Sequence, residues 1–259
     1  MFKGGRDFRL IAFSSPQIQS TIDVINYLPY QDLSEPEEIF VSDSEFSFSH
    51  LFYYREDPIN PAHEGLEEII VDRNGDKVYR YNMYIGSIVV NESLICIIAV
   101  PFTIMAIELF QFFNKAIRGH NNLYVKVNIG SVIAAVKNGQ SLDGDIKLTR
   151  LDLEIEGDSP AKTAVLGGTD VPNSLTFDCI ISSLKDLEIR YRKCKITYDN
   201  KTGKKIVIDV DRFGNYSIPL HSNGKNLPNL LTVFNYLYDI NGIVEDSILP
   251  STRNLQDEG

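Results

Sequence analysis

The alternation of apolar and polar side chains predicts a protein built largely from antiparallel strands. Residues 8–13, FRLIAF, predict a first strand, and residues 45–54 place an aromatic or histidine side chain at every second position, the pattern of a strand with an aromatic face. Farther along, IIVDRNGDKVYRY sets Asn74-Gly75 between two strand-like runs, which is the preferred chemistry of a tight hairpin turn. We expect a meander of strands from this hairpin to about residue 100.

The longest apolar stretch, residues 93–113, is about as long as a transmembrane helix must be, but Pro101 divides it. The residues before Pro101 are rich in Ile, Cys and Val and predict a buried strand, whereas those after it recur with the spacing of a core-facing helix. Glu108 lies in the second part and would be costly in lipid. We therefore predict a strand followed by a helix, with no insertion into a membrane.

Helical spacing of apolar residues recurs in three other segments. One starts with Ser15 as its N-cap, one starts near Asn173, and one runs from near Pro228 to Asn241-Gly242, a sequence that ends helices. For the helix that starts near Asn173 we expect an inner face formed by Leu175, Cys179, Ile180 and Leu184.

These elements predict an α+β fold of mostly antiparallel sheets, formed by hairpins and a meander, with three to four packed helices in two lobes. Residues 122–138 predict two further short strands. The turn-rich segment NGQSLDGD, residues 138–145, marks the division. We therefore expect an N-terminal α+β lobe over residues 1–140, a C-terminal α+β lobe with a basic hairpin over residues 141–243, and a loose tail over residues 244–259.

Composition limits the partners that the protein can have. The chain has 259 residues, a net charge of −10 and a sequence pI near 4.9, so as a whole it repels polyanions at neutral pH. Its cysteines, Cys96, Cys179 and Cys194, are odd in number and lack metal-ligand spacing, which favours a reducing compartment over a disulfide scaffold. Because residues 1–13 hold no apolar run long enough for a signal peptide, we expect a cytoplasmic protein. We also expect a protein without a cofactor.

One local patch suits nucleic acid, namely a predicted hairpin over residues 190–205 that is the densest basic cluster of the chain. Its cations are interleaved with Tyr191 and Tyr198, which suits phosphate contacts with duplex DNA and stacking on unpaired bases. The same composition also suits a solvated edge hairpin that lysines protect against aggregation. The candidate nucleic-acid-binding residues are Arg190, Arg192, Lys193, Lys195, Lys201, Lys204 and Lys205.

A second candidate site is acidic and lies in the segment LDLEIE, residues 151–156. Asp152, Glu154 and Glu156 fall at alternate positions, so on a strand their carboxylates point to one side and are candidates to hold a hard cation, as in a metal-dependent nuclease. In the alternative interpretation the acids merely face water, while the core receives Leu151, Leu153 and Ile155.

The sequence carries no catalytic motif that points to an enzyme. Neither Gly4-Gly5 nor Gly167-Gly168 matches a phosphate-binding or dinucleotide-binding loop. None of the histidines lies near a cysteine or serine in a nucleophile signature: His50, His63, His120 and His221. These observations favour a protein that is not an enzyme.

The C-terminal third resembles a known family. A basic hairpin is followed by GNYSIPL, residues 214–220, and then by an amphipathic helix with paired tyrosines, an order that resembles the end of RexA-type phage-exclusion proteins. The meander into SIVVNESLICIIAVPF, residues 87–102, comes in a similar order. The resemblance implies a phage or bacterial defence protein that self-associates, binds duplex DNA without strong sequence preference and acts with a second, often membrane-bound, component. The acidic net charge departs from that family.

Three functions remain open at this point. The first is a non-enzymatic binding or sensor component of a phage-defence or exclusion system, which contacts duplex DNA through the basic hairpin. The second is an acidic protein-binding adaptor or inhibitor, for which the acidic surface and the aromatic-rich strands supply the contacts with a protein partner or within a homo-oligomer. The third is a metal-dependent nuclease that uses Asp152, Glu154 and Glu156.

Overall fold

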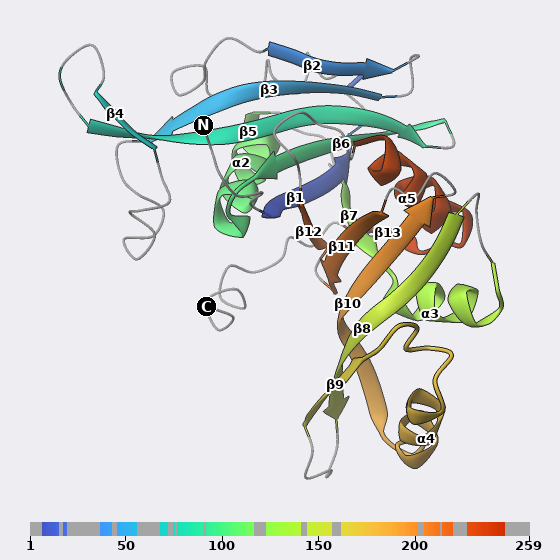
Figure 1. Ribbon diagram of the computed structural model, residues 1–259. Helices are drawn as coiled ribbons and strands as arrows, with labels where there is room; N and C mark the ends of the chain where they lie inside the picture. The colour runs from blue at the N-terminus through green and yellow to red at the C-terminus, as the bar shows by residue number, and fades with distance from the viewer. Residues whose placement is uncertain are drawn as a thin grey trace. The chain divides into compact units, whose positions relative to one another are not determined.

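The computed structural model describes the greater part of the chain and confirms the predicted α+β class (Figure 1). Helices alternate with groups of strands, and the sheets are mostly antiparallel. The described residues are 7–15, 18–19, 37–42, 46–55, 68–71, 75, 77–90, 92–116, 123–140, 144–156, 162–200, 205–212, 214–219 and 227–246.

The chain divides into two compact units. The first consists of Met1–Tyr124, Ser222–Gly224 and Glu245–Gly259, and the second of Val125–His221 and Lys225–Val244. The main division therefore lies between residues 124 and 125, upstream of the division that the sequence analysis placed after residue 140. The reason is that residues 129–137 form a helix that packs against two strands of the second unit.

The first unit contains an antiparallel sheet in the order β2-β3-β5-β6-β1, with the short β4 paired to the start of β5. The predicted hairpin between β4 and β5 is present, and Gly75 adopts the left-handed conformation, with φ of 89°. The rest of that turn lies outside the described residues. The strands are β1 (Asp7–Ser14), β2 (Glu37–Ser42), β3 (Phe46–Arg55), β4 (Glu68–Val71), β5 (Lys77–Val90) and β6 (Ser93–Val100).

Helix α2 (Thr103–Ala116) packs against β1 and β6 and closes the core of the first unit. The ring centroid of Phe13 in β1 lies 4.9 Å from that of Phe110 and 4.7 Å from that of Phe113. All three rings are almost completely buried, and each stabilises the fold by about 1.5–3 kcal/mol. This arrangement confirms the strand and core-facing helix predicted on either side of Pro101. No helix in the described part of the chain is long and apolar enough to cross a membrane.

The second unit is built on an antiparallel sheet in the order β12-β11-β10-β8-β9. The most extensive strand pairing in this sheet is between β8 and β10. Helix α3 packs against both of these strands, and α5 packs against β10 and β11. The elements are β7 (Leu123–Val127), α3 (Ile129–Lys137), β8 (Gly144–Glu156), β9 (Thr163–Gly167), α4 (Leu175–Ser183), β10 (Glu188–Asn200), β11 (Lys205–Asp211), β12 (Asn215–Pro219), α5 (Leu227–Asp239) and β13 (Ile243–Asp246).

The prediction of two short strands over residues 122–138 is wrong in its second half. β7 ends at Val127, and the Asn128 side chain then accepts a hydrogen bond from the backbone N–H of Ser131 at 3.2 Å, which caps α3. β-Branched residues in this segment favoured a strand. The helix forms because burial follows the helical period, with the inward side chains Ile129, Val132, Ile133 and Val136.

The expected inner face of α4 is wrong for Leu175 and Cys179, whereas Ile180 and Leu184 are half-buried. Ser174 caps this helix by accepting a hydrogen bond from the Phe177 N–H at 3.2 Å, and Phe177 is the helix residue that is buried. Leu175 is 84% exposed and Cys179 is exposed, whereas Ile180 is half-buried. Phe177 is the large aromatic side chain of the helix and its burial is favourable; the Lys137 ammonium of α3 lies 5.1 Å from its ring centroid and also pairs with Asp178.

The predicted end of the last helix is confirmed in its geometry. Asn241 adopts a left-handed conformation with φ of 53°, its N–H donates to the Tyr238 carbonyl, and the Gly242 N–H donates to the Leu237 carbonyl at 2.6 Å. These are the paired bonds of a Schellman motif. The predicted tail from residue 244 begins within β13, and residues 247–259 lie outside the described part of the chain. The helix predicted from Ser15 falls mostly outside it too.

Candidate binding surface of the second unit

The acidic and the basic candidate residues lie on neighbouring strands. β8 and β10 pair antiparallel over almost all of their length, and the register sets Arg190 opposite Glu154 and Lys193 opposite Asp152. Opposed residues of an antiparallel pair point to the same side of the sheet, with Cβ atoms about 4.5–5.5 Å apart. The two candidate sites, which are well separated in sequence, therefore form one surface. We call this side of β8, β10 and β11 the charged face.

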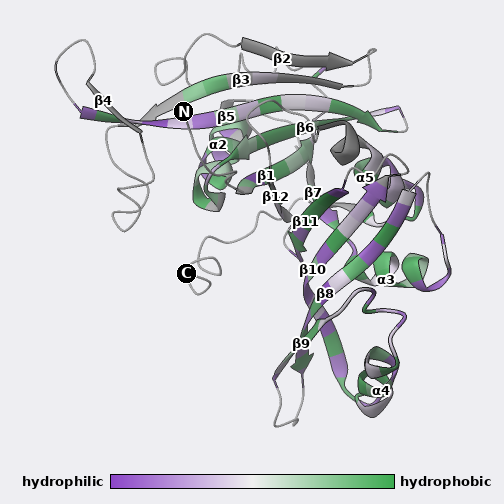
Figure 2. Cartoon of the chain, viewed as in Figure 1, coloured by the Kyte–Doolittle hydropathy of each residue, from purple (hydrophilic) through white to green (hydrophobic). Residues whose placement is uncertain are grey.

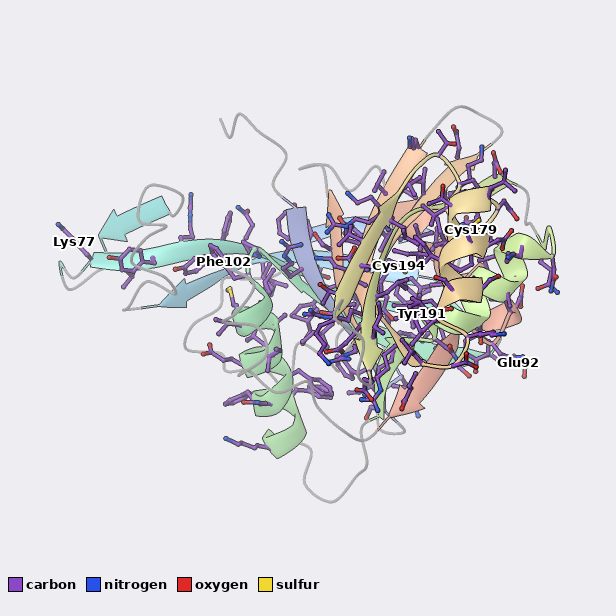
Figure 3. All side chains as sticks on the ribbon, turned by 90° about the horizontal axis from the view of Figure 1, so that it is seen from below. Lys77, Glu92, Phe102, Cys179, Tyr191 and Cys194 are labelled. Carbon is purple, nitrogen blue, oxygen red and sulfur yellow. The ribbon has the colours of Figure 1, made fainter. Side chains whose placement is uncertain are left out.

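The other side of these strands forms the core of the second unit. Leu153 of β8 and Ile196 of β10 are 0% exposed, and apolar and polar residues alternate along both strands (Figure 2). Tyr191, which lies opposite Leu153, approaches Gly130 of α3 (Figure 3). The helix α3 therefore covers the core side, and the charged face is the side away from it.

A β-bulge decides which basic residues share the charged face. Register passes from Tyr191 opposite Leu153 to Lys193 opposite Asp152, so Arg192 is an extra residue in β10. Without the bulge, simple alternation would place Arg190 and Lys193 on opposite sides of the strand. With it, Arg190, Lys193 and Lys195 point to the same side. Sequence patterns do not reveal such a bulge, and this arrangement was not predicted.

The carboxylates of β8 lie within ion-pair distance of arginines. Arg190 Nη1 lies 2.7 Å from Glu156 Oε1, and Arg212 Nη1 lies 2.5 Å from Glu154 Oε2. Asp152 accepts a hydrogen bond from Arg150 Nε at 2.7 Å, and this bond raises the pKa of the Arg150 guanidinium. Each acid of the sequence-predicted triplet is thus neutralised by a cation.

Two basic residues of the hairpin, Arg190 and Lys195, form ion pairs in the same way. Arg190 also pairs with Glu188 of its own strand at 3.1 Å, and Lys195 Nζ lies 3.5 Å from Asp209 of β11. Lys193 lies between Asp152 and Asp211 in the register of its two neighbouring strands. Lys205 is exposed, while Lys201 and Lys204 lie outside the described residues. Of these carboxylates, Asp209 and Asp211 were missed, although the alternation in IVIDVD predicts that they share a face.

The charged face is consequently close to electrically neutral. The three strands β8, β10 and β11 carry seven Lys or Arg side chains and eight Asp or Glu side chains. Opposite charges in register on adjacent strands attract each other, and Lys147, Arg150, Arg190 and Lys195 each form an ion pair with a protein carboxylate. This surface offers a patterned mixture of charges, and it differs from the uninterrupted basic stripe that phosphate backbones bind best.

A metal site at the acidic triplet would have to displace the arginines. Asp152, Glu154 and Glu156 do share a side of β8, as alternation predicts. Within the described ranges, no cluster of three or more His, Cys, Asp or Glu side chains is arranged to hold a metal ion. Among the histidines, His50 lies in β3, and the other three fall outside the described ranges.

The cysteines differ sharply in environment. Cys194 is fully buried in β10, and burial raises the pKa of its thiol. Cys96 is buried in β6, whereas Cys179 is exposed on α4 (Figure 3). The two buried thiols are therefore poor nucleophiles.

Comparison with known proteins adds no family to this geometry. No protein-family model matches the chain, and no curated protein matches its sequence.

Proposed function

We propose that this protein is a non-enzymatic, protein-binding component of a phage-exclusion or defence system, acting in the cytoplasm through its charged face. The observation that carries the proposal is the pairing of β8 and β11 with β10, which, together with Arg212 after β11, sets acidic and basic side chains at ion-pair distances of 2.5–3.5 Å. A fixed pattern of both signs recognises a complementary protein surface and steers its approach. The exclusion-system context rests on the resemblance to RexA-type proteins.

Energetics support a role in recognition for these charges. The side chains of Arg190, Arg212 and Glu154 are 34–51% exposed. Ion pairs at this exposure contribute about 0–1 kcal/mol each to folding. The buried side chains on the other side of the sheet already hold the strands together. The ordered charges are thus not required for folding and remain accessible to a partner.

Two measurements test the proposal. The first is fluorescence polarisation with a random-sequence duplex across a salt series, for which we expect a flat baseline because the charged face is nearly neutral. The second is recovery of partners by the tagged full chain from its own host, with quantification by mass spectrometry. We expect the wild-type chain to retain a protein partner in stoichiometric amount.

A matched pair of variants makes the second measurement specific. Arg190→Glu with Lys195→Glu reverses two charges of the charged face, and Lys77→Glu with Lys115→Glu makes the same change at exposed sites of the first unit. The first variant should lose the partner at least tenfold, whereas the control should retain it. Equal retention by both variants would refute a role for the charged face.

A second candidate function is contact with duplex DNA through the tip of the β10–β11 hairpin. Lys205 is exposed there, and Lys201 and Lys204 precede it in the sequence. Three phosphate contacts would give a salt slope of about −2.7. Such a slope in the wild type, abolished when the three lysines are changed to glutamine, would favour this function over the first.

A further inference from the structure

The outer edge of β9 is built for strand pairing. β9 (Thr163–Gly167) ends the strand order of the second unit and pairs with β8 on one side. In the described part of the chain no strand pairs with its other side. An unpaired edge presents a row of backbone donors and acceptors that another strand can bind.

The hydrogen bonds of this hairpin show which backbone groups point outward. The Ile155 N–H donates to the Lys162 carbonyl at 2.9 Å, and the Gly168 N–H donates to the Thr149 carbonyl at 3.1 Å. Residues two apart along a strand direct their N–H and C=O groups to the same side. Even-numbered residues of β9 therefore bond to β8. The N–H and C=O groups of Thr163, Val165 and Gly167 point away from it.

This edge lacks the features with which proteins block unwanted pairing. Its sequence, TAVLG, has no charge and no proline. The edge strand of the first unit differs, because β2 carries Glu37 and Glu38 and has an irregular register beside them. Val165 is moreover 60% exposed, a large apolar side chain at the centre of the edge.

We propose that two copies of this chain associate by antiparallel pairing of β9 with β9, centred on Val165. The sequence of β9 is self-complementary in that register. Val165 faces Val165 of the second copy and exchanges both of its outward hydrogen bonds with it, while Thr163 faces Gly167 at the two symmetry-related positions. The opposed valines then contact each other across the pair and cover apolar surface that is exposed in the single chain.

The pairing should be weak and dependent on concentration. Strands of this length bury less surface than stable dimers need. Each copy also carries a net charge of −10, and this repulsion opposes association. Salt screens that repulsion, whereas backbone hydrogen bonds are little affected. Association should therefore strengthen between about 50 mM and 300 mM salt, a range over which the Debye length falls roughly two- to threefold.

The test is sedimentation velocity of the full chain over a concentration series, with two variants of the edge. Val165→Pro removes an outward N–H that bonds to nothing within the β8–β9 hairpin, and Val165→Lys sets two ammonium groups opposite each other. Both should weaken association roughly tenfold or more. The control is Val89→Lys, which makes the same substitution at an exposed valine of β5. It should associate as the wild type does.

Hydrogen exchange provides a second readout that does not depend on variants. The amides of Thr163, Val165 and Gly167 should exchange more slowly at high protein concentration than at low concentration, whereas amides already bonded to β8 should not change. A chain that stays monomeric at high concentration, or a dimer that survives both Val165 variants, overturns the proposal. Protection of these amides only when a different protein is added overturns it as well. Because the charged-face variants leave β9 intact, their failure to lose a partner would not affect this result.

Discussion

Removing the carboxylates of β8 should convert the charged face into a DNA-binding surface. The triple variant Asp152→Asn, Glu154→Gln, Glu156→Gln keeps the size and shape of each side chain. It removes the partners that lie closest to Arg150, Arg212 and Arg190. The strands β8, β10 and β11 then carry seven cations against five anions, because three of their eight acids are gone.

The size of the effect follows from the number of cations released. With about three cations free to contact phosphates, the logarithm of affinity should fall with the logarithm of salt concentration at a slope of about −2.7. This corresponds to a loss of about forty-fold between 50 mM and 200 mM salt. Because the lost ion pairs are partly exposed, the variant should lose only about 0–3 kcal/mol of unfolding free energy and stay folded.

The assay is fluorescence polarisation with a labelled random-sequence duplex, alongside urea unfolding to check the fold. A control variant, Glu92→Gln, Asp186→Asn, Asp239→Asn, makes the same change in net charge at exposed positions away from the three strands. We expect no binding by the wild type or the control and salt-dependent binding by the triple variant. If the triple variant is as inert as the wild type, or if the wild type already binds with the same slope, the carboxylates do not mask the cations and the reasoning fails.

Three further predictions concern packing and titration. Gly144→Ala should cost about 1–3 kcal/mol of unfolding free energy in a urea titration, because the added Cβ would lie 2.7 Å from a backbone carbonyl oxygen of β10. Gly167→Ala is the control: its Cβ would have no atom within 4 Å, and its unfolding free energy should stay within about 0.5 kcal/mol of the wild type. In the native protein a thiol reagent should modify Cys179 rapidly and Cys194 only after unfolding, and rapid modification of both would contradict the burial of β10. Burial raises the pKa of Tyr236 from 10.0 to about 12. The contribution of this side chain to stability is therefore present below pH 10 and lost as pH rises towards 12. In urea titrations over this range, the unfolding free energy of Tyr236→Phe should decline less than that of the wild type.

Local signals in the sequence were sufficient for elements whose surroundings agree with their own pattern. Pro101 separates a β-rich run from a run with helical spacing, and the structure has β6 and α2 on either side of it. Asn241-Gly242 ends α5 because these residues accept the left-handed backbone and close the Schellman bonds. In both cases the decisive interactions lie within a few residues along the chain.

The failures have the opposite character, because they depend on contacts between distant segments. The inner face of α4 was predicted from spacing, yet Phe177 is the buried residue of the helix, in contact with Lys137 from another helix. The charged face depends on the register of β8 against β10 and on the bulge at Arg192. Neither feature can be predicted from the sequence of one strand alone. The sequence of the basic cluster therefore could not show that carboxylates of the neighbouring strands lie beside Arg190, Lys193 and Lys195.

Salt separates the interactions inferred for the second unit, because screening changes the strength or rate of each in a different way. Contact of the hairpin tip with DNA would weaken steeply as salt rises, since it releases counterions. Pairing of β9 would strengthen, since two chains of net charge −10 repel each other less when screened. A protein partner held by the charged face should bind more slowly at high salt because its steering is screened, while contacts at the centre of the interface change little. A single salt series on the wild-type chain, read by polarisation, sedimentation and partner recovery, therefore distinguishes the three interactions before any residue is changed.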